Sequence, residues 1–382
     1  MTIHGEALIP RDGSHSAALR RMLLRNLLVP LLALVAHRAV LASVAFACGY
    51  DPFSAASWTR WDSAFYLDIA NDGYRKPTHC PPESHYPADA WCGNTAWFPG
   101  YPYAIRAASR WTGADSAAVA VWLSAVAQFV SLCAIWSMLK GPHRFATLTM
   151  AAFFPGNIYY AAVFPTSLCM CFTVLCLVLC ARSRFGLASV SAVGAAVSYP
   201  TGALLAPILI AWSFFARKRG ALVVAAASLF GLATVFVLMH RETGEWDAFI
   251  RLQAKYSYMG NALDTYLAHL KPIINGKYRD AKGFWTGLQT LLCLVIVFVA
   301  CGMAARIRSS LAFLIAADVC AFWIAPLILG GRLSLYRSEA LLMPAVVLVD
   351  LVPHRFRQEA LAAVCVLLSI PMAALFFRQV LV

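Results

Sequence analysis

Apolar runs long enough to cross a lipid bilayer recur along this chain from near Leu23 to Val382. The longer runs have about 18 or more residues, the length that a helix needs to cross a hydrocarbon core of about 30 Å. The membrane is therefore the main solvent of the chain. Of the 382 residues, 61% are hydrophobic and 13% are charged, against about 25% charged residues in soluble domains. The sequence predicts an all-α polytopic membrane protein.

The runs divide the chain into about eleven predicted spans within a single membrane domain that covers residues 1–382. Two short spans are separated by Ser-Tyr-Pro-Thr-Gly at residues 198–202, where a proline and a glycine end the helix. This pair predicts a hairpin, and broken spans of this kind are tolerated where they border protein or a water-filled cavity. The predicted spans are 26–48, 117–139, 145–163, 165–181, 186–199, 201–216, 220–240, 284–305, 309–330, 339–352 and 359–378.

Basic residues lie at every second junction between predicted spans, and the net charge of the chain is +13. The positive-inside rule then places residues 1–25 in the cytoplasm and the loops 49–116, 241–283 and 331–338 outside it. Residues 1–25 show no small-residue cleavage site, so we expect the first span to be retained. Because the charge is spread over the junctions, it does not indicate a nucleic-acid partner. We expect a multi-pass protein of the inner (cytoplasmic) membrane.

Most of the twelve cysteines lie inside apolar runs, where cysteine behaves as a small hydrophobic residue. Cys80 and Cys92 are different, because both lie in the loop 49–116. Outside the cytoplasm they either form a disulfide or stay as two thiols, and the sequence leaves both outcomes open.

The loop 49–116 is the longest predicted connection, and long loops in compact domains are usually functional or disordered. Its aromatic content argues against disorder, so we expect it to fold on the membrane surface. The aromatic residues in question are Trp58, Trp61, Phe65, Tyr66, Tyr74, Tyr86, Trp91, Trp97, Phe98, Tyr101, Tyr103 and Trp111.

Asp62 lies within a stretch, residues 58–74, in which aromatic residues recur at the i, i+3 and i+4 spacing of an amphipathic helix. Gly73 supplies a stop signal for this helix. Asp62 falls on the apolar face, and a carboxylate is seldom placed among aromatic side chains unless it is paired or used, because removing its charge from water is costly. Asp62 therefore either pairs with Arg60 or caps a helix, or it takes part in catalysis.

A second segment, Trp-Phe-Pro-Gly-Tyr-Pro at residues 97–102, precedes the second predicted span. Its two prolines predict an extended turn. Its aromatic residues, Trp97 and Tyr101 among them, either bind substrate or belong to an interfacial aromatic belt.

These two segments together resemble the signature of the PIG-V family. The resemblance rests on Arg-Trp-Asp-Ser-Ala-Phe-Tyr-Leu-Asp-Ile-Ala-Asn-Asp-Gly-Tyr at residues 60–74, followed by residues 97–102. Weaker similarity covers residues 154–167, residues 243–253 and Arg337 ahead of a proline. The family includes the second mannosyltransferase of GPI-anchor assembly and bacterial relatives, and the short loops of this chain are similar to those of a bacterial member.

The resemblance implies a glycosyltransferase of the GT-C superfamily, with a bundle of membrane helices and a long first outer loop that carries amphipathic interfacial helices. Such enzymes take a sugar from a polyprenyl-phosphate donor on the luminal or periplasmic face, with an aspartate of the first outer loop near the reacting centre. By this resemblance Asp62 is the leading catalytic candidate. The chain departs from the family's pattern at Tyr199-Pro200, Ser338 and Leu168, so its donor and acceptor contacts need not be those of the family.

Sugar transfer from a lipid phosphate needs a base for the acceptor hydroxyl and a cation for the departing phosphate. Asp62 can act as the base when it lies within about 2.6–3.2 Å of that hydroxyl. A guanidinium suits the phosphate, although an outer cation can instead contact lipid headgroups. The cationic candidates are Arg337, Arg332, Arg251 and Lys255. Further substrate-binding candidates, whose aromatic members either stack on sugar or pack against the membrane, are Arg60, Trp61, Tyr66, Trp97 and Tyr101.

The residues and the resemblance together favour an inverting mannosyltransferase that uses polyprenyl-phosphate-mannose and acts on a lipid-linked, glycan or protein acceptor outside the cytoplasm. Two alternatives stay open. One is a GT-C transferase with another polyprenyl-phosphate sugar, such as arabinose or glucose, and the other is a transporter or lipid flippase. We expect no metal and no other cofactor, because the histidine spacing in the first outer loop gives no recognised ligand set. The expected partners are the donor, the acceptor and the bilayer.

Overall fold

The structure, a computed structural model, describes residues 13–84, 86–87, 89–254, 256, 261–276, 279–329, 335–353 and 355–381. Helices make up most of this part of the chain, and two short strands pair in it. In chain order the elements are α1 (Gly13–Ala47), η1 (Ala55–Trp58), α2 (Ser63–Asp72), β1 (Thr78–His79), β2 (Trp91–Cys92), α3 (Gly100–Thr112), α4 (Ser116–Met138), α5 (Arg144–Ala152), α6 (Ile158–Ala161), α7 (Thr166–Ala181), α8 (Phe185–Ser198), η2 (Pro200–Leu204), α9 (Leu205–Ala216), α10 (Gly220–Thr243), α11 (Ala248–Ala254), α12 (Ala262–Ile274), α13 (Ala281–Ile307), α14 (Ser310–Ile328), α15 (Leu335–Ser338), η3 (Glu339–Ala345), α16 (Val346–Val349) and α17 (Arg355–Phe377).

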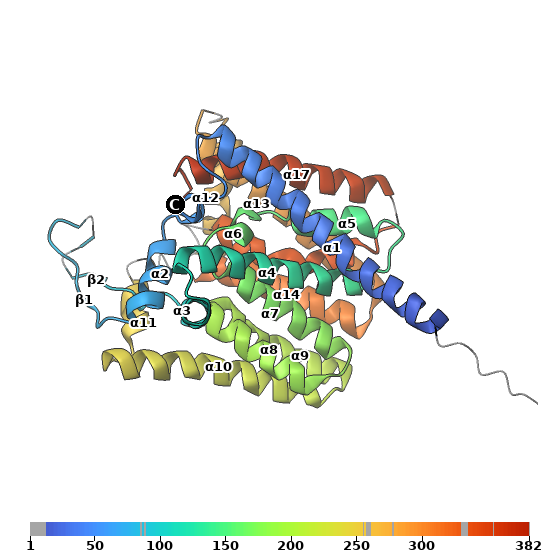
Figure 1. The fold of residues 1–382 in the computed structure, drawn as a ribbon, viewed down its shortest axis with the longest axis horizontal. Coiled ribbons are helices and arrows are strands. Elements are labelled where there is room, and N and C mark those ends of the chain that lie inside the picture. The colour runs from blue at the N-terminus through green and yellow to red at the C-terminus, as the bar shows by residue number, and fades with distance from the viewer. Residues whose placement is uncertain are drawn as a thin grey trace, which may run out of the picture.

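Six of the described helices are long and apolar enough to cross a membrane by length and composition: α1 from Asn26, α4, α10, α13, α14 and α17. Shorter apolar helices lie between them in the chain, namely α7, α8 and the segment from η2 to α9. The predicted all-α polytopic membrane fold is confirmed. Figure 1 shows the long helices running alongside one another, with α2, α3, α11 and the β1–β2 hairpin gathered at one end of the bundle, here called the loop end.

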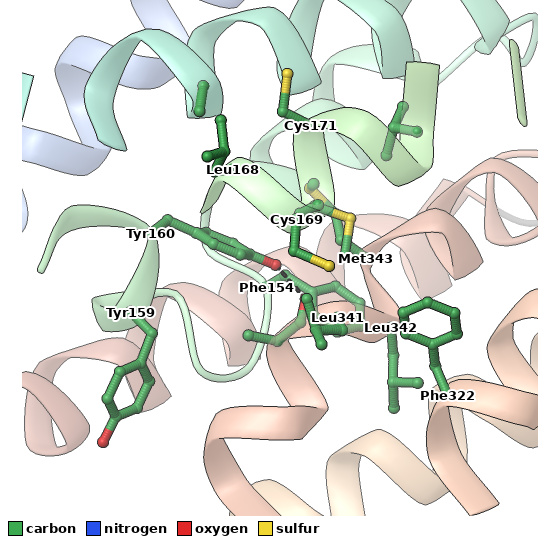
Figure 2. Close-up of a cluster of buried hydrophobic side chains, with 14 of the residues drawn as sticks. Phe154, Tyr159, Tyr160, Leu168, Cys169, Cys171, Phe322, Leu341, Leu342 and Met343 are labelled. Atoms are coloured by element: carbon green, nitrogen blue, oxygen red, sulfur yellow. Dashed lines mark hydrogen bonds between the residues drawn. The ribbon is translucent and has the colours of Figure 1, made fainter. Parts of the chain in front are cut away.

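The helices pack as a continuous bundle. α4 lies against α1 and α7, α8 against α7 and α10, and α13 against α12 and α14. Deep in the bundle, side chains of α7, α14, η3 and the chain before α7 meet in one buried cluster (Figure 2). Phe322 of α14, Cys169 of α7 and Met343 of η3 are all within it, and each is almost fully buried.

The predicted span 145–163 is wrong as a single helix, because α5 ends at Ala152 and only the short α6 follows. Pro155 has no N–H to donate, and Gly156 has φ +81°, so the chain turns there inside an apolar run. A Cβ at Gly156 would lie 2.8 Å from the carbonyl oxygen of Tyr336, so the close approach to α15 requires glycine.

The predicted span 339–352 is also interrupted. Residues 339–345 form the 3-10 helix η3, with Pro344 inside it, and residues 346–349 form one turn of α-helix, α16. Proline removes a backbone donor and disfavours the α conformation of the residue before it, which accounts for the tighter 3-10 winding.

The first loop folds into short helices at the loop end. The predicted amphipathic helix over residues 58–74 begins only at Ser63, and it ends at Gly73, as predicted, with φ +92°. The extended turn predicted for residues 97–102 is wrong from Gly100 onward, because α3 starts there, and only residues 97–99 lie outside a helix. Its prolines are accepted there because the first N–H groups of a helix have no intrahelical partner.

Cys80 and Cys92 form a disulfide, which decides between the two outcomes that the sequence left open. The bond closes the antiparallel hairpin in which Thr78 pairs with Cys92. The chain after the hairpin is tied to the second loop: the hydroxyl of Thr95 donates to the carbonyl of Ala248 in α11 at 3.1 Å.

Candidate active site

Asp62 and Arg337 form a direct ion pair between Oδ2 and Nη1, although 275 residues separate them. Their side chains keep 30% and 14% of their surface exposed, so the pair is largely shielded from water. The two simpler roles considered for Asp62 are not observed. Its side chain makes no capping hydrogen bond, and the Arg60 guanidinium instead donates to the carbonyls of Ala56 and Thr59.

The Asp62 carboxylate bonds Arg337 and not the first N–H groups of its own helix, and it directly follows a left-handed residue. Trp61 has φ +51°, a left-handed conformation that costs an aromatic residue free energy. The Ser63 hydroxyl accepts the N–H of Arg60 at 3.0 Å and closes this turn. Asp62 stands at the N-terminus of α2, where the helix dipole favours a negative charge.

The chain on either side of Arg337 is held by Gln289 of α13. The Gln289 amide donates to the carbonyl of Tyr336 at 2.9 Å and to the carboxylate of Glu339 at 2.7 Å, so the chain is fixed on both sides of Arg337. The guanidinium lies 5.6 Å from the ring centroid of Phe164.

Electrostatics keep Arg337 charged. Burial, the largest single effect, lowers the pKa of its guanidinium. The Asp62 carboxylate and, to a smaller extent, the tyrosine hydroxyls around it raise that pKa, and together they outweigh burial. The net pKa therefore lies above its usual value. Burial, with the nearby Tyr199 and Asp62, raises the pKa of Tyr66 well above its usual value, so its hydroxyl keeps its proton.

A cavity of about 540 Å³ opens beside the ion pair. Phe65 and Trp97 stack in its wall with ring centroids 3.7 Å apart. Among the described lining residues, Asp62 and Arg337 carry the charges and most of the others are aromatic. The lining residues are Trp61, Asp62, Phe65, Tyr66, Tyr86, Cys92, Gly93, Ala96, Trp97, Phe98, Tyr199, Pro200, Gln253, Tyr256, Leu329 and Arg337.

The structure brings Asp62, Trp61, Tyr66, Trp97 and Arg337 together at this cavity, all of them candidates from the sequence.

Arg60, Tyr101 and Arg251 do not line the cavity. The Arg60 guanidinium lies over the ring of Tyr50. The Tyr101 hydroxyl donates to the carbonyl of Ala120 at 2.9 Å and is fully buried. Arg251 pairs with two acidic side chains of its own loop, at 2.7 and 3.5 Å. Arg332 and Lys255 lie outside the described residues.

Several residues that line the cavity were not among the site residues expected from the sequence. Tyr199 and Pro200 reach the cavity from the α8–η2 junction, so the broken hairpin does border a cavity, as its sequence indicated. Gln253 comes from the second loop, where it donates to the carbonyl of Ala96 at 3.1 Å. Phe65 lies one residue before Tyr66, and its aromatic character was the available signal.

The arrangement combines a carboxylate that can accept a proton, a guanidinium that can bind an anion, and aromatic walls. Guanidinium groups bind phosphate oxygens by paired hydrogen bonds. Aromatic walls offer flat apolar surface for a ligand that has both apolar and hydroxyl groups.

No protein-family model matches this sequence, and no curated protein matches it. Solved structures do match. The oligosaccharyltransferase of Archaeoglobus fulgidus in complex with Zn and sulfate is 14% identical, with a TM-score of 0.51, and the match covers 91% of this chain and 53% of that chain. The oligosaccharyltransferase AglB of the same organism, in complex with an inhibitory peptide and a dolichol-phosphate, is 14% identical with a TM-score of 0.48, and the match covers 92% and 56% of the two chains.

This chain thus spans about half the length of the proteins that it matches. The oligosaccharyltransferase is a GT-C glycosyltransferase, and the GT-C-like helical bundle predicted for this chain is confirmed at the level of the fold. Membership in the PIG-V family stays a prediction.

Proposed function

We propose that this protein is a membrane glycosyltransferase that transfers mannose, with inversion, from polyprenyl-phosphate-mannose to a hydroxyl of a lipid-linked, glycan or protein acceptor. The observation that carries the proposal is the Asp62–Arg337 pair at an aromatic-lined cavity in a GT-C-like fold. The signature around Asp62 in the first loop supports the choice of donor.

In the proposed reaction the carboxylate of Asp62 takes the proton of the acceptor hydroxyl. The hydroxyl oxygen forms a bond to the anomeric carbon on the face opposite the phosphate. The bond from that carbon to the phosphate oxygen breaks, and its electron pair leaves with the phosphate. A positioned base of this kind contributes about 10²–10⁴-fold to the rate.

Arg337 stabilises the charge that develops on the departing phosphate. A guanidinium has five N–H donors, so Arg337 can keep its contact with Asp62 while it binds phosphate oxygens. Because this cation serves the leaving group, we expect the reaction to proceed without a metal, which stays a prediction.

The described walls of the cavity carry no charge besides this pair, which suits a neutral hexose. Trp97 is covered on one ring face by Phe65. Trp61, which also lines the cavity next to the proposed base, is the better candidate for stacking on the sugar.

The test is transfer of radiolabelled mannose from synthetic polyprenyl-phosphate-mannose, in membranes that contain matched amounts of wild type, Asp62→Asn or Asp68→Asn. Asp68 is a control on the same helix, because its carboxylate pairs with Arg75 and does not line the cavity. We expect Asp62→Asn to lose about 10²-fold or more of the rate and Asp68→Asn to stay within about twofold of wild type.

Equal rates for wild type and Asp62→Asn would remove Asp62 as the base. Donors that carry glucose or arabinose are assayed in parallel. Transfer from one of these donors and not from polyprenyl-phosphate-mannose would leave the assignment as a transferase in place and change its donor sugar. No labelling from any donor, in membranes where the protein is folded, would overturn the proposal in favour of transport.

A further inference from the structure

A turn buried inside the bundle, residues 153–165, contacts the chain around both members of the ion pair. It contains the break between α5 and α6, and each of its residues is buried. We call it the buried turn. A chain that reverses inside a membrane protein needs other elements to bond its freed backbone groups.

The buried turn is bonded to the segment that leads into Asp62. The N–H of Val163 donates to the carbonyl of Trp58 at 3.1 Å. The ring of Phe164 lies edge-on to Tyr66 with centroids 6.2 Å apart, and it also lies beside the Arg337 guanidinium. One end of the buried turn therefore touches both sides of the pair.

The earlier part of the buried turn is bonded to the segment that carries Arg337. The Tyr160 hydroxyl donates to the carbonyl of Ala340, and Figure 2 shows Tyr160 reaching toward the chain at Leu341. The N–H of Gly156 donates to Gln289 at 3.1 Å, and Gln289 in turn bonds the chain on both sides of Arg337.

Arg38 of α1 bonds backbone carbonyls within the buried turn that are left free where α6 ends at Ala161. Its guanidinium donates to the carbonyls of Tyr160 at 3.1 Å and Ala161 at 3.3 Å, and to the Gln128 side chain at 3.3 Å. The neighbouring His37 bonds Asn157 of the same turn at 3.1 Å. Side chains of α1 thus bond the buried turn, and Gln128 of α4 bonds both Arg38 and His37.

The position of Arg38 is costly. It lies within the candidate span from Asn26 to Ala47, and among the described residues no carboxylate pairs with it. Arginine inside a membrane helix is rare and is normally tied to a specific partner or function. Here its partners are carbonyls of a turn that reaches the ion pair.

We propose that Arg38 is a positioning residue that aligns Asp62 with Arg337 through the buried turn. Its contact chain runs from Arg38 to the carbonyls of the turn, and from the turn to Trp58 on one side and Ala340 on the other. The alignment itself is independent of the reaction, whereas its effect on the rate rests on the proposed function.

The alignment is tested without substrate, by thermal unfolding in detergent. Asp62→Asn, Arg337→Met and the double variant are compared in the wild-type background and in Arg38→Met. Once one partner of a coupled pair has been removed, removing the second costs little further stability. The summed Tm shifts of the two single variants should therefore exceed the Tm shift of the double variant by about 2 °C or more. We expect this non-additivity to fall by half or more in the Arg38→Met background.

Gln358→Met is the matched control background. The Gln358 amide also donates to backbone carbonyls at an interrupted helix, those of Val349, Asp350 and Val352, and none of these three bonds involves the buried turn. The coupling between Asp62 and Arg337 should survive in Gln358→Met. Equal coupling in both backgrounds would overturn the alignment. If Arg38→Met does not fold, the milder Gln128→Met, which removes one partner of Arg38, takes its place in the same comparison.

The kinetic consequence is measured on the same proteins. A small misplacement of reacting groups lowers the rate strongly, so we expect Arg38→Met to lower kcat about 10-fold with KM within about twofold. Gln358→Met should keep kcat. A full kcat in Arg38→Met would overturn the kinetic part. Absence of transfer by wild type would count against the proposed function, while the unfolding comparison would still decide the alignment.

Discussion

Exchanging the charges of Asp62 and Arg337 separates the stability of the ion pair from its chemistry. In Asp62→Arg/Arg337→Asp the long and the short side chain trade places, so the summed length across the gap is unchanged. The cavity of about 540 Å³ beside the pair gives the new arginine room. We expect the exchanged pair to form and the double variant to fold.

Each single variant leaves two like charges in contact. Unit charges of one sign about 4 Å apart repel by about 4 kcal/mol at an effective dielectric constant of about 20. Water relieves little of this, because the native side chains keep only 30% and 14% of their surface exposed. Breaking a buried pair costs roughly 3–5 kcal/mol, so we expect each single variant to lose about that much stability and the double variant to regain most of it.

Activity should not return with stability. Position 62 would carry a guanidinium in place of the proposed base, so transfer should stay about 10²-fold or more below wild type. The assay pairs thermal unfolding in detergent with labelled-sugar transfer. Recovery of transfer in the double variant would refute the assignment of Asp62 as the base. A double variant no more stable than the single variants would refute the coupling of the two residues.

Three further outcomes are expected. Trp61→Gly should unfold at a higher temperature than Trp61→Ala by an amount equivalent to about 1 kcal/mol, because only glycine adopts φ +51° without strain; equal Tm values would contradict this. Arg251→Gln should keep its transfer rate within about twofold, since Arg251 pairs with acids of its own loop and does not line the cavity; a large loss of rate would return it to the phosphate site. Gly100→Ala should lose about 1–3 kcal/mol of stability, because its methyl group would lie 2.8 Å from the Val197 carbonyl. Gly186→Ala, where the new methyl group would have nothing within 4 Å, should not lose this stability, and similar unfolding of the two variants would argue against the close contact of α3 with α8.

The interrupted elements have a common consequence for the site. The turn in the chain after α5 and the 3-10 helix η3 both lie in the buried centre of the bundle, and both contain a proline. The side chains of Arg38, Gln289 and Tyr160 form hydrogen bonds with backbone groups of these two elements. Bonds of this kind hold one geometry, which is what a charged pair needs in order to keep its alignment.

Hydropathy by itself determined the class of this protein and the places of most of its helices. An apolar run cannot expose unpaired backbone in lipid, so runs such as 117–139 and 220–240 become helices whatever their neighbours are. Local chemistry likewise determined the end of α2 at Gly73, since glycine adopts φ +92° at little cost. The aromatic content of the first loop correctly indicated an ordered segment.

Tertiary structure decided the rest. Averaged hydropathy does not register the break in the span expected at 145–163, because Pro155, Gly156 and Asn157 are set in a mostly apolar run. The break persists because side chains of α1 and α13 bond the turn there. The partner of Asp62 depended on packing as well. Arg60 is two residues away, but the left-handed turn at Trp61 and the bonds around Arg337 bring a guanidinium from 275 residues further along the chain to the carboxylate instead. Spacing along a chain reports neighbours on one helix, whereas a contact between segments so far apart exists only once the bundle has packed.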